Sequence, residues 1–209
     1  LSQKDPSQAL TALLQLNVAE ASPEDRKTYY KNKIILNEKL HKITEARVAT
    51  EDLLREPSLT AEEKEFALGR KLWFAELELD FATALKTAQQ MKFENLSADD
   101  RVLKMALYAE LAEKSPEQYY QQYLKQSQDA EKKALIAMQL IRSSKQPAKD
   151  LEIYKPYFKS QTGSYARAAL NVYGQTKDRK ILEKALKEKG ASQDAAFVMI
   201  EKILVLSDI

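Results

Sequence analysis

The chain has 209 residues, a net charge of +2, 31% charged residues and no cysteine. The near balance of charge argues against a nucleic-acid groove or an anionic membrane surface, and the lack of cysteine excludes disulfides, thiolate catalysis and cysteine-ligated metals. Only four glycines are present and no alternating strand pattern is seen, so the composition favours an all-α protein.

Helix-start signals recur along the chain with a period of roughly 34 residues, which is the length of a helix-pair repeat. Ser, Thr and Asp side chains cap the first turn of a helix, and proline suits its first position. Stacked antiparallel helix pairs form solenoids, which mostly present surfaces to partners. The signals are Asp5-Pro6, Ser22-Pro23, Thr60, Ser97, Ser115-Pro116, Pro147 and Ser192.

Three alanines mark the start of the second helix in successive predicted hairpins. Ala9, Ala46 and Ala84 are spaced by about one repeat, and each is followed by further packing residues one and two turns later. Two helices approach closely at such a position, and a bulky side chain there would overpack the crossing by about 1–3 kcal/mol.

This pattern resembles the tetratricopeptide repeat over about residues 5–92. The aromatic, small and tyrosine positions of that family fall on Tyr30, Ile34 and Asn37, and then on Leu68, Leu72 and Ala75, while Pro57 lies near the expected end of one unit. The family's glycine in the first helix is not reproduced. The resemblance implies a right-handed α-solenoid of antiparallel helix hairpins, with residues 1–209 forming one domain that binds a protein or peptide.

The second half of the chain predicts further hairpins. Pro156 is expected to kink or end its helix, and Gly174 and Gly190 are expected to cap helix ends. The predicted helices are 97–113, a partner opening at Ser115-Pro116 with Gln118 in a capping box, 129–144, 147–158, 164–173, 178–189 and a last helix from Ser192.

The last helix is apolar on several sides, and leaving each large side chain exposed forgoes roughly 1.5–3 kcal/mol of burial. Two interpretations stay open: a further domain or another chain covers this helix, or the helix folds back into the groove. The chain begins with Leu1, which predicts a removed leader or a segment of a longer protein. The apolar residues are Phe197, Val198, Ile200, Ile203, Leu204, Val205 and Leu206.

Tyrosines are the best candidates for a binding site. If their helices face a common groove, they form an aromatic wall suited to a peptide; the alternative is packing between hairpins. The candidates are Tyr119, Tyr120, Tyr123, Tyr154, Tyr157 and Tyr165.

The remaining polar candidates are interpreted as structural or solvated. His41 is the only histidine and lies at a predicted helix junction, where we expect a turn residue rather than a catalytic base. No catalytic residue, metal site or cofactor is predicted, because no phosphate-binding loop, nucleophile elbow or zinc motif is present. The acidic groups are Glu62, Glu63 and Glu65, and Glu76, Glu78 and Asp80; the basic segment is 177–189.

The sequence therefore predicts a non-catalytic protein–protein interaction scaffold of a bacterial protein, without nucleic-acid partners or a transmembrane segment. The expected compartment is the periplasm or cell envelope, which the lack of cysteine slightly favours, with the cytoplasm as the alternative. The rival hypothesis is a helical accessory or regulatory domain of a larger cell-wall-processing enzyme or of its activator. A third hypothesis is a stand-alone enzyme.

Overall fold

The structure, a computed structural model, describes residues 5–206. Within that range it contains twelve α-helices, two short 3-10 helices and no strand, which confirms the all-α prediction. The chain packs into two compact units. Unit 1 comprises the residues up to Leu96 together with Leu107–Ser115, and unit 2 comprises Ser97–Ala106 together with the residues from Pro116 onward. The prediction of a single domain is not tested by this packing.

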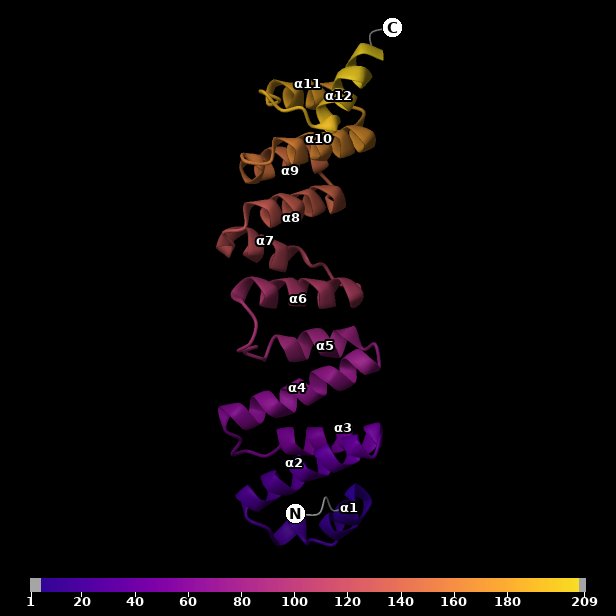
Figure 1. Cartoon of the computed structure of the whole chain (residues 1–209), viewed down its shortest axis with the longest axis vertical. Helices are drawn as coiled ribbons and strands as arrows, with labels where there is room; N and C mark the ends of the chain where they lie inside the picture. The colour runs from indigo at the N-terminus through magenta and orange to yellow at the C-terminus, as the bar shows by residue number, and fades with distance from the viewer. Residues whose placement is uncertain (1–4, 207–209) are drawn as a thin grey trace. The chain divides into compact units, whose positions relative to one another are not determined.

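Unit 1 consists of consecutive helices that each pack against the next one along the chain (Figure 1). The strongest pairings are those of α2 with α3 and of α4 with α5. The elements are α1 (Pro6–Leu14), η1 (Val18–Glu20), α2 (Pro23–Lys39), α3 (Ile43–Leu54), α4 (Ala61–Leu77) and α5 (Phe81–Ala88).

The helix starts of unit 1 follow the expected capping chemistry. The side chain of Asp5 accepts a hydrogen bond from Ser7 N, and the Ser22 hydroxyl accepts one from Asp25 N at 3.1 Å. Thr60 and Glu63 form a reciprocal capping box at the start of α4. Such caps satisfy amide groups that the first turn leaves without a partner.

Two of the three alanines singled out in the sequence are buried. Ala46 in α3 and Ala84 in α5 are both fully buried, and each lies early in its helix, whereas Ala9 in α1 is only half-buried. Ile34, Leu53 and Ala67 join α2, α3 and α4 in one apolar cluster. Burying a side chain of the size of Leu53 contributes about 1.5–3 kcal/mol.

Tight turns connect the helices of these two pairs. His41 lies between α2 and α3 with φ of 55°, and Leu79 lies between α4 and α5 with φ of 56°. The backbone therefore enters the left-handed region at both turns, which lets the chain reverse in a few residues. His41 is exposed there and has the turn position that the sequence predicted.

Unit 2 is organised around α10, which packs against α8, α9, α11 and α12. Its core includes Ala166, Ala169 and Val172 of α10, all fully buried. The elements are the first part of α6 (Ala98–Leu111), α7 (Glu117–Gln126), α8 (Ala130–Ser143), α9 (Pro147–Tyr154), η2 (Lys155–Phe158), α10 (Thr162–Thr176), α11 (Arg179–Lys187) and α12 (Ala195–Leu206).

Pro156 acts as predicted, whereas Gly174 does not. The α-helix ends at Tyr154 and continues as the 3-10 helix η2 that contains Pro156. Gly174 lies inside α10 rather than at its end, and the left-handed cap is Lys177 with φ of 58°. The prediction for Gly174 was wrong because the turn that precedes α11 places its positive φ on Lys177. Gly190 has φ of 53°, but it lies two residues beyond Glu188, which is the C-cap of α11, so its positive φ serves the following turn.

The last helix, α12, has one buried and one exposed apolar face. Ala196, Phe197 and Ile200 are buried in the core of unit 2. The exposed face carries Val198, Met199, Val205 and Leu206, with 42%, 57%, 63% and 70% of each residue exposed. Burial against α10 and α11 thus accounts for only part of this helix's apolar surface.

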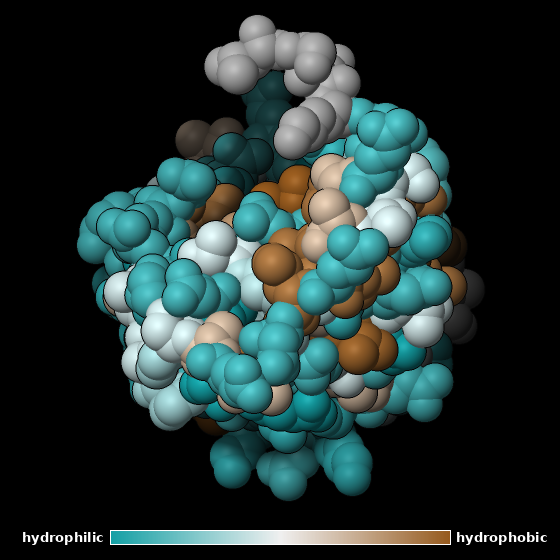
Figure 2. Space-filling view, turned by 90° about the horizontal axis from the view of Figure 1, so that it is seen from below, coloured by the Kyte–Doolittle hydropathy of each residue, from teal (hydrophilic) through white to brown (hydrophobic). Residues whose placement is uncertain are grey.

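A second apolar surface lies in unit 1. Figure 2 shows hydrophobic side chains gathered among hydrophilic ones on the face seen from the end where α1 lies. Leu14 of α1 and Leu16 just beyond it are exposed by 55% and 59%. Between residues 5 and 206, no helix combines the length and the apolar character needed to cross a membrane.

Candidate functional site

The predicted tyrosine wall is mostly inside unit 2. Tyr119, Tyr120, Tyr123 and Tyr165 expose 9% or less of their surface, so their rings serve the packing of α7 and α10. Packing between helices, the alternative that the sequence left open, therefore describes Tyr119, Tyr120 and Tyr123, whereas Tyr165 also lines the pocket described below.

Tyr154 and Tyr157 are only half-buried. Their ring centroids lie 6.3 Å apart, and the Nζ atom of Lys133 lies 5.7 Å from the centre of the Tyr157 ring. Burial raises the pKa of Tyr154 above its usual value, so this side chain stays a neutral phenol. These two rings form a small aromatic surface beside α8, and they do not line the pocket described next.

A pocket of about 350 Å³ lies where η2, the start of α10 and the end of α11 meet. Its volume is at the lower end of the range for small-ligand sites. Apolar surface comes from Pro156 and Phe158, and charged side chains surround it. The lining residues are Glu152, Lys155, Pro156, Phe158, Lys159, Thr162, Tyr165 and Glu188.

The pocket originates in the helix break at Pro156. Proline lacks an amide hydrogen and its ring clashes within an α-helix, so the chain leaves the α conformation and turns towards α10. Phe158, at the end of η2, is buried and lies 5.7 Å from the Tyr165 ring. This pair fixes η2 against α10 and leaves the adjoining surface of Lys155, Lys159 and Thr162 open.

Two ion pairs neutralise the carboxylates of the pocket. Lys155 Nζ lies 2.7 Å from Glu188 Oε1, and Lys184 Nζ lies 3.1 Å from Glu152 Oε1. The hydrogen bond to Glu188 raises the pKa of Lys155. The same ammonium lies 5.6 Å from the centre of the Tyr165 ring, a cation–π distance. The pocket thus combines an apolar surface with charged side chains and hydrogen-bonding groups. This arrangement suits the non-covalent binding of a side chain or of a small polar molecule.

Sequence reasoning identified Tyr165 and the break at Pro156 but not the other residues of the pocket. Lysine and glutamate are common throughout this highly charged chain, so the residue type alone did not mark Lys155, Lys159 or Glu188 as pocket residues. The usable signal was the coincidence of a helix-ending proline with lysines on both sides of it. The contribution of Glu188 required the fold, because it comes from the end of α11.

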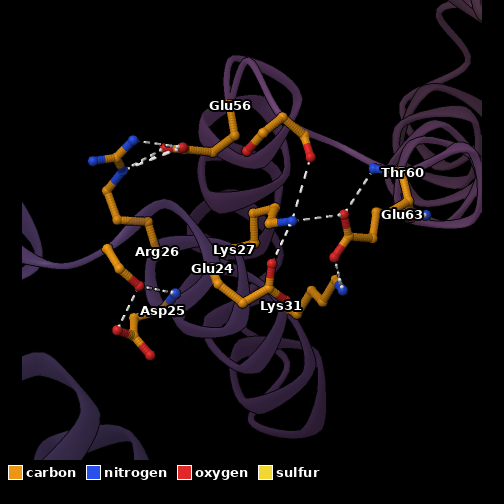
Figure 3. Close-up of polar contacts among 10 residues, drawn as sticks. Glu24, Asp25, Arg26, Lys27, Lys31, Glu56, Thr60 and Glu63 are labelled. Atoms are coloured by element: carbon orange, nitrogen blue, oxygen red, sulfur yellow. Dashed lines mark hydrogen bonds and ion pairs between the residues drawn. The ribbon is translucent and has the colours of Figure 1, made fainter.

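A second candidate is the polar cluster of unit 1, which Figure 3 shows between α2 and the start of α4. Lys27 is only 4% exposed. Its ammonium lies 2.6 Å from Glu24 Oε2 and 3.2 Å from Glu63 Oε2, and it donates to Ser58 O at 3.3 Å. Glu63 also accepts from Lys31 Nζ at 2.6 Å.

Every group at the centre of this cluster is paired. The three hydrogens of the Lys27 ammonium each have an acceptor, and Glu63 additionally accepts from Thr60 N at 2.8 Å. The hydrogen bond from Lys31 is the largest of the effects that lower the pKa of Glu63 to about 2. A carboxylate held ionised and fully bonded is a poor proton-transfer group, so this cluster is structural: it fixes α2 against α4.

The acidic groups singled out in the sequence are also occupied by structural contacts. Asp80 caps α5 by accepting from Thr83 N at 3.0 Å, and the Tyr108 hydroxyl donates to Glu76. Glu65 accepts from the amides of Lys92 and Phe93. In the part of the chain that the structure describes, no three histidine or acidic side chains gather into a group that could hold a metal ion.

Comparison with known proteins leaves the pocket as the main guide to function. No family model, curated protein or solved structure matches this chain.

Proposed function

We propose that this chain is a non-catalytic protein-interaction module of the helical-repeat class, a right-handed α-solenoid similar to the tetratricopeptide repeat, which binds a peptide segment of a partner protein in the pocket beside η2. The observation that carries the binding role is the pocket itself: an apolar floor at Pro156 and Phe158 surrounded by charged side chains. Peptide sites combine an apolar anchor with a few polar groups in this way.

The repeat itself is supported by the spacing of long-range side-chain bonds. Lys31 bonds Glu63 across 32 residues, Tyr108 bonds Glu76 across 32, and Lys155 bonds Glu188 across 33. Lys184 and Glu152 add another bond across 32 residues. These pairs connect α2 with α4, α4 with α6, η2 with the end of α11, and α9 with α11. Each bond joins helices that are two apart in the chain, as stacked hairpins require.

The compartment that we propose is the periplasm or cell envelope. The support is the complete lack of cysteine, which avoids unwanted thiol oxidation in an oxidising compartment. The cytoplasm is the alternative.

A second candidate function is a helical accessory domain of a larger cell-wall-processing enzyme or of its activator. The exposed face of α12 favours it, because Met199, Val205 and Leu206 are each more than half exposed. Contact with a further domain or chain would remove this apolar surface from water.

The binding role is tested by selecting from a library of random twelve-residue peptides displayed on phage, with the whole chain immobilised. We expect peptides whose binding is lost in Thr162→Phe, because the ring fills the pocket. The matched control Lys149→Phe places the same ring on an exposed part of α9 outside the pocket and should leave binding unchanged. Recovery of no peptide, or of peptides that bind Thr162→Phe equally well, would contradict the proposal.

A further inference from the structure

The balance of charge in the pocket is positive once its ion pairs are counted. Glu188 and Glu152 are paired with Lys155 and Lys184 at 2.7 and 3.1 Å. Lys159, in contrast, is exposed and forms no ion pair with any residue between 5 and 206. An unpaired ammonium beside an apolar floor attracts an anionic group.

Tyr165 supplies a hydrogen-bond donor that the protein itself does not use. The residue is only 3% exposed, it lines the pocket, and its hydroxyl has no hydrogen-bond partner among the described residues. The hydroxyl oxygen of Tyr165 is not fully buried, so it reaches the surface of the pocket and can donate to a ligand. Burial also raises the pKa of Tyr165, so the hydroxyl keeps its proton and remains a donor near neutral pH.

The start of α10 adds further donors. Thr162 is the first residue of this 15-residue helix and lines the pocket, and the capping residue Gln161 gives the first turn no side-chain hydrogen bond. The amides at the start of a helix carry partial positive charge. Asp194 lies against Gly163 nearby, but its carboxylate is paired with Arg167 at 2.7 Å.

From these three observations we infer that the pocket recognises an acidic residue of the peptide, whose carboxylate is bound by the Lys159 ammonium and by the hydroxyls of Tyr165 and Thr162. This inference rests on the proposed function and adds the chemistry of the partner. The methylene groups of an aspartate or glutamate would lie on Pro156 and Phe158. A basic residue would instead meet the like charges of Lys155 and Lys159.

The test is an NMR titration of the whole ¹⁵N-labelled chain with N-acetyl-glutamate methylamide, and with its glutamine and lysine counterparts. We expect the glutamate probe to shift the amides of residues 159–165 and to bind about tenfold tighter than the glutamine probe, since a charge-assisted hydrogen bond is about twice as strong as a neutral one. Equal binding of the two probes, or shifts confined to other residues, would overturn the inference.

Variants separate this chemistry from a change in folding. Lys159→Gln, at an exposed position, should remove most of the preference for glutamate, whereas Lys149→Gln on α9 should retain it. Tyr165→Phe should weaken the glutamate probe and leave the helical circular dichroism intact. A preference that survives Lys159→Gln would contradict the assignment.

The peptide selection distinguishes the inference from the proposed function. Selected peptides that depend on an open pocket but lack an enriched Asp or Glu would overturn the inference and leave the function standing. Failure to select any peptide would overturn the function itself.

Discussion

Lys27 of α2 and Glu63 of α4 form an ion pair of 3.2 Å between Nζ and Oε2, although 36 residues separate them. Both side chains are at least nine-tenths buried. Glu63 is also the residue that completes the capping box of α4. One carboxylate therefore sets the start of α4 and ties it to α2, so that local capping and the contact between these two helices depend on the same group.

Acidic pH should lower the stability of unit 1, because the carboxylate of Glu63 becomes protonated. Its pKa is lowered from an ordinary value of 4.5 to about 2, so the stabilisation is complete above pH 4.5 and is lost as the pH falls towards 2. We expect Glu63→Gln to lower the thermal midpoint near neutral pH and to reduce its fall between pH 4.5 and 2. Thermal scans followed by circular dichroism measure both effects.

Glu62→Gln is the matched control, because Glu62 is the exposed neighbour of Glu63 in the first turn of α4. It should leave the acid dependence close to that of the original chain. An equal loss of acid dependence in both variants would show that Glu63 is not the group responsible.

Two tyrosines should respond in opposite directions to loss of the hydroxyl. The hydroxyl of Tyr123 is buried without a partner, so Tyr123→Phe should raise the free energy of unfolding by about 1 kcal/mol. The hydroxyl of Tyr108 donates to Glu76, and Tyr108→Phe should lower that free energy by about 1.5–3 kcal/mol. Urea denaturation measures both changes. A loss of stability in Tyr123→Phe would show that its hydroxyl is bonded in solution.

Substitution of two glycines of α10, Gly163 and Gly174, should also change the stability in opposite directions. A Cβ atom at Gly163 would overlap the carboxylate of Asp194, whereas one at Gly174 meets nothing within 4 Å. We expect Gly163→Ala to lower the free energy of unfolding by about 1 kcal/mol, because the carboxylate of Asp194 must move away and loses its bonds to Arg167 and to Ala196 N. Gly174→Ala should raise it by about 0.5–1 kcal/mol, because alanine is the better helix former. Equal effects of the two substitutions would contradict the placement of Asp194.

The prediction of one domain can be tested with one cavity-creating substitution in each unit. Leu53 in unit 1 and Leu182 in unit 2 are both fully buried, and replacing either with alanine should cost about 2–5 kcal/mol. If residues 1–209 unfold as one domain, both variants shift the same calorimetric transition. Two transitions, each shifted by only one variant, would show that the units unfold independently.

Local signals predicted several helix starts because capping and proline chemistry act over a few residues. Asp5, Ser22 and Thr60 begin α1, α2 and α4 as their side chains require. The capping box expected at Ser115 was wrong: the N-cap of α7 is Pro116, without a side-chain cap hydrogen bond. Gly174 failed as a predicted cap: a glycine permits the left-handed conformation without imposing it, and Lys177 adopts it instead.

The binding pocket was harder to predict because it depends on contacts between distant segments. The tyrosine pattern on α7 identified buried packing residues, since an amphipathic spacing does not reveal whether a ring faces a neighbour or a groove. The pairing of Lys155 with Glu188 spans 33 residues. Neither residue differs by type from the many other charged residues of the chain, so only the fold brings them together.

The most direct test of the proposed role is to locate a selected peptide on the protein. A nitroxide spin label is attached to the peptide, and paramagnetic broadening is measured for each amide of the ¹⁵N-labelled chain. Binding in the pocket predicts broadening centred on residues 155–165 and on Glu188. Broadening centred on α12 or α1, or none at all, would contradict it.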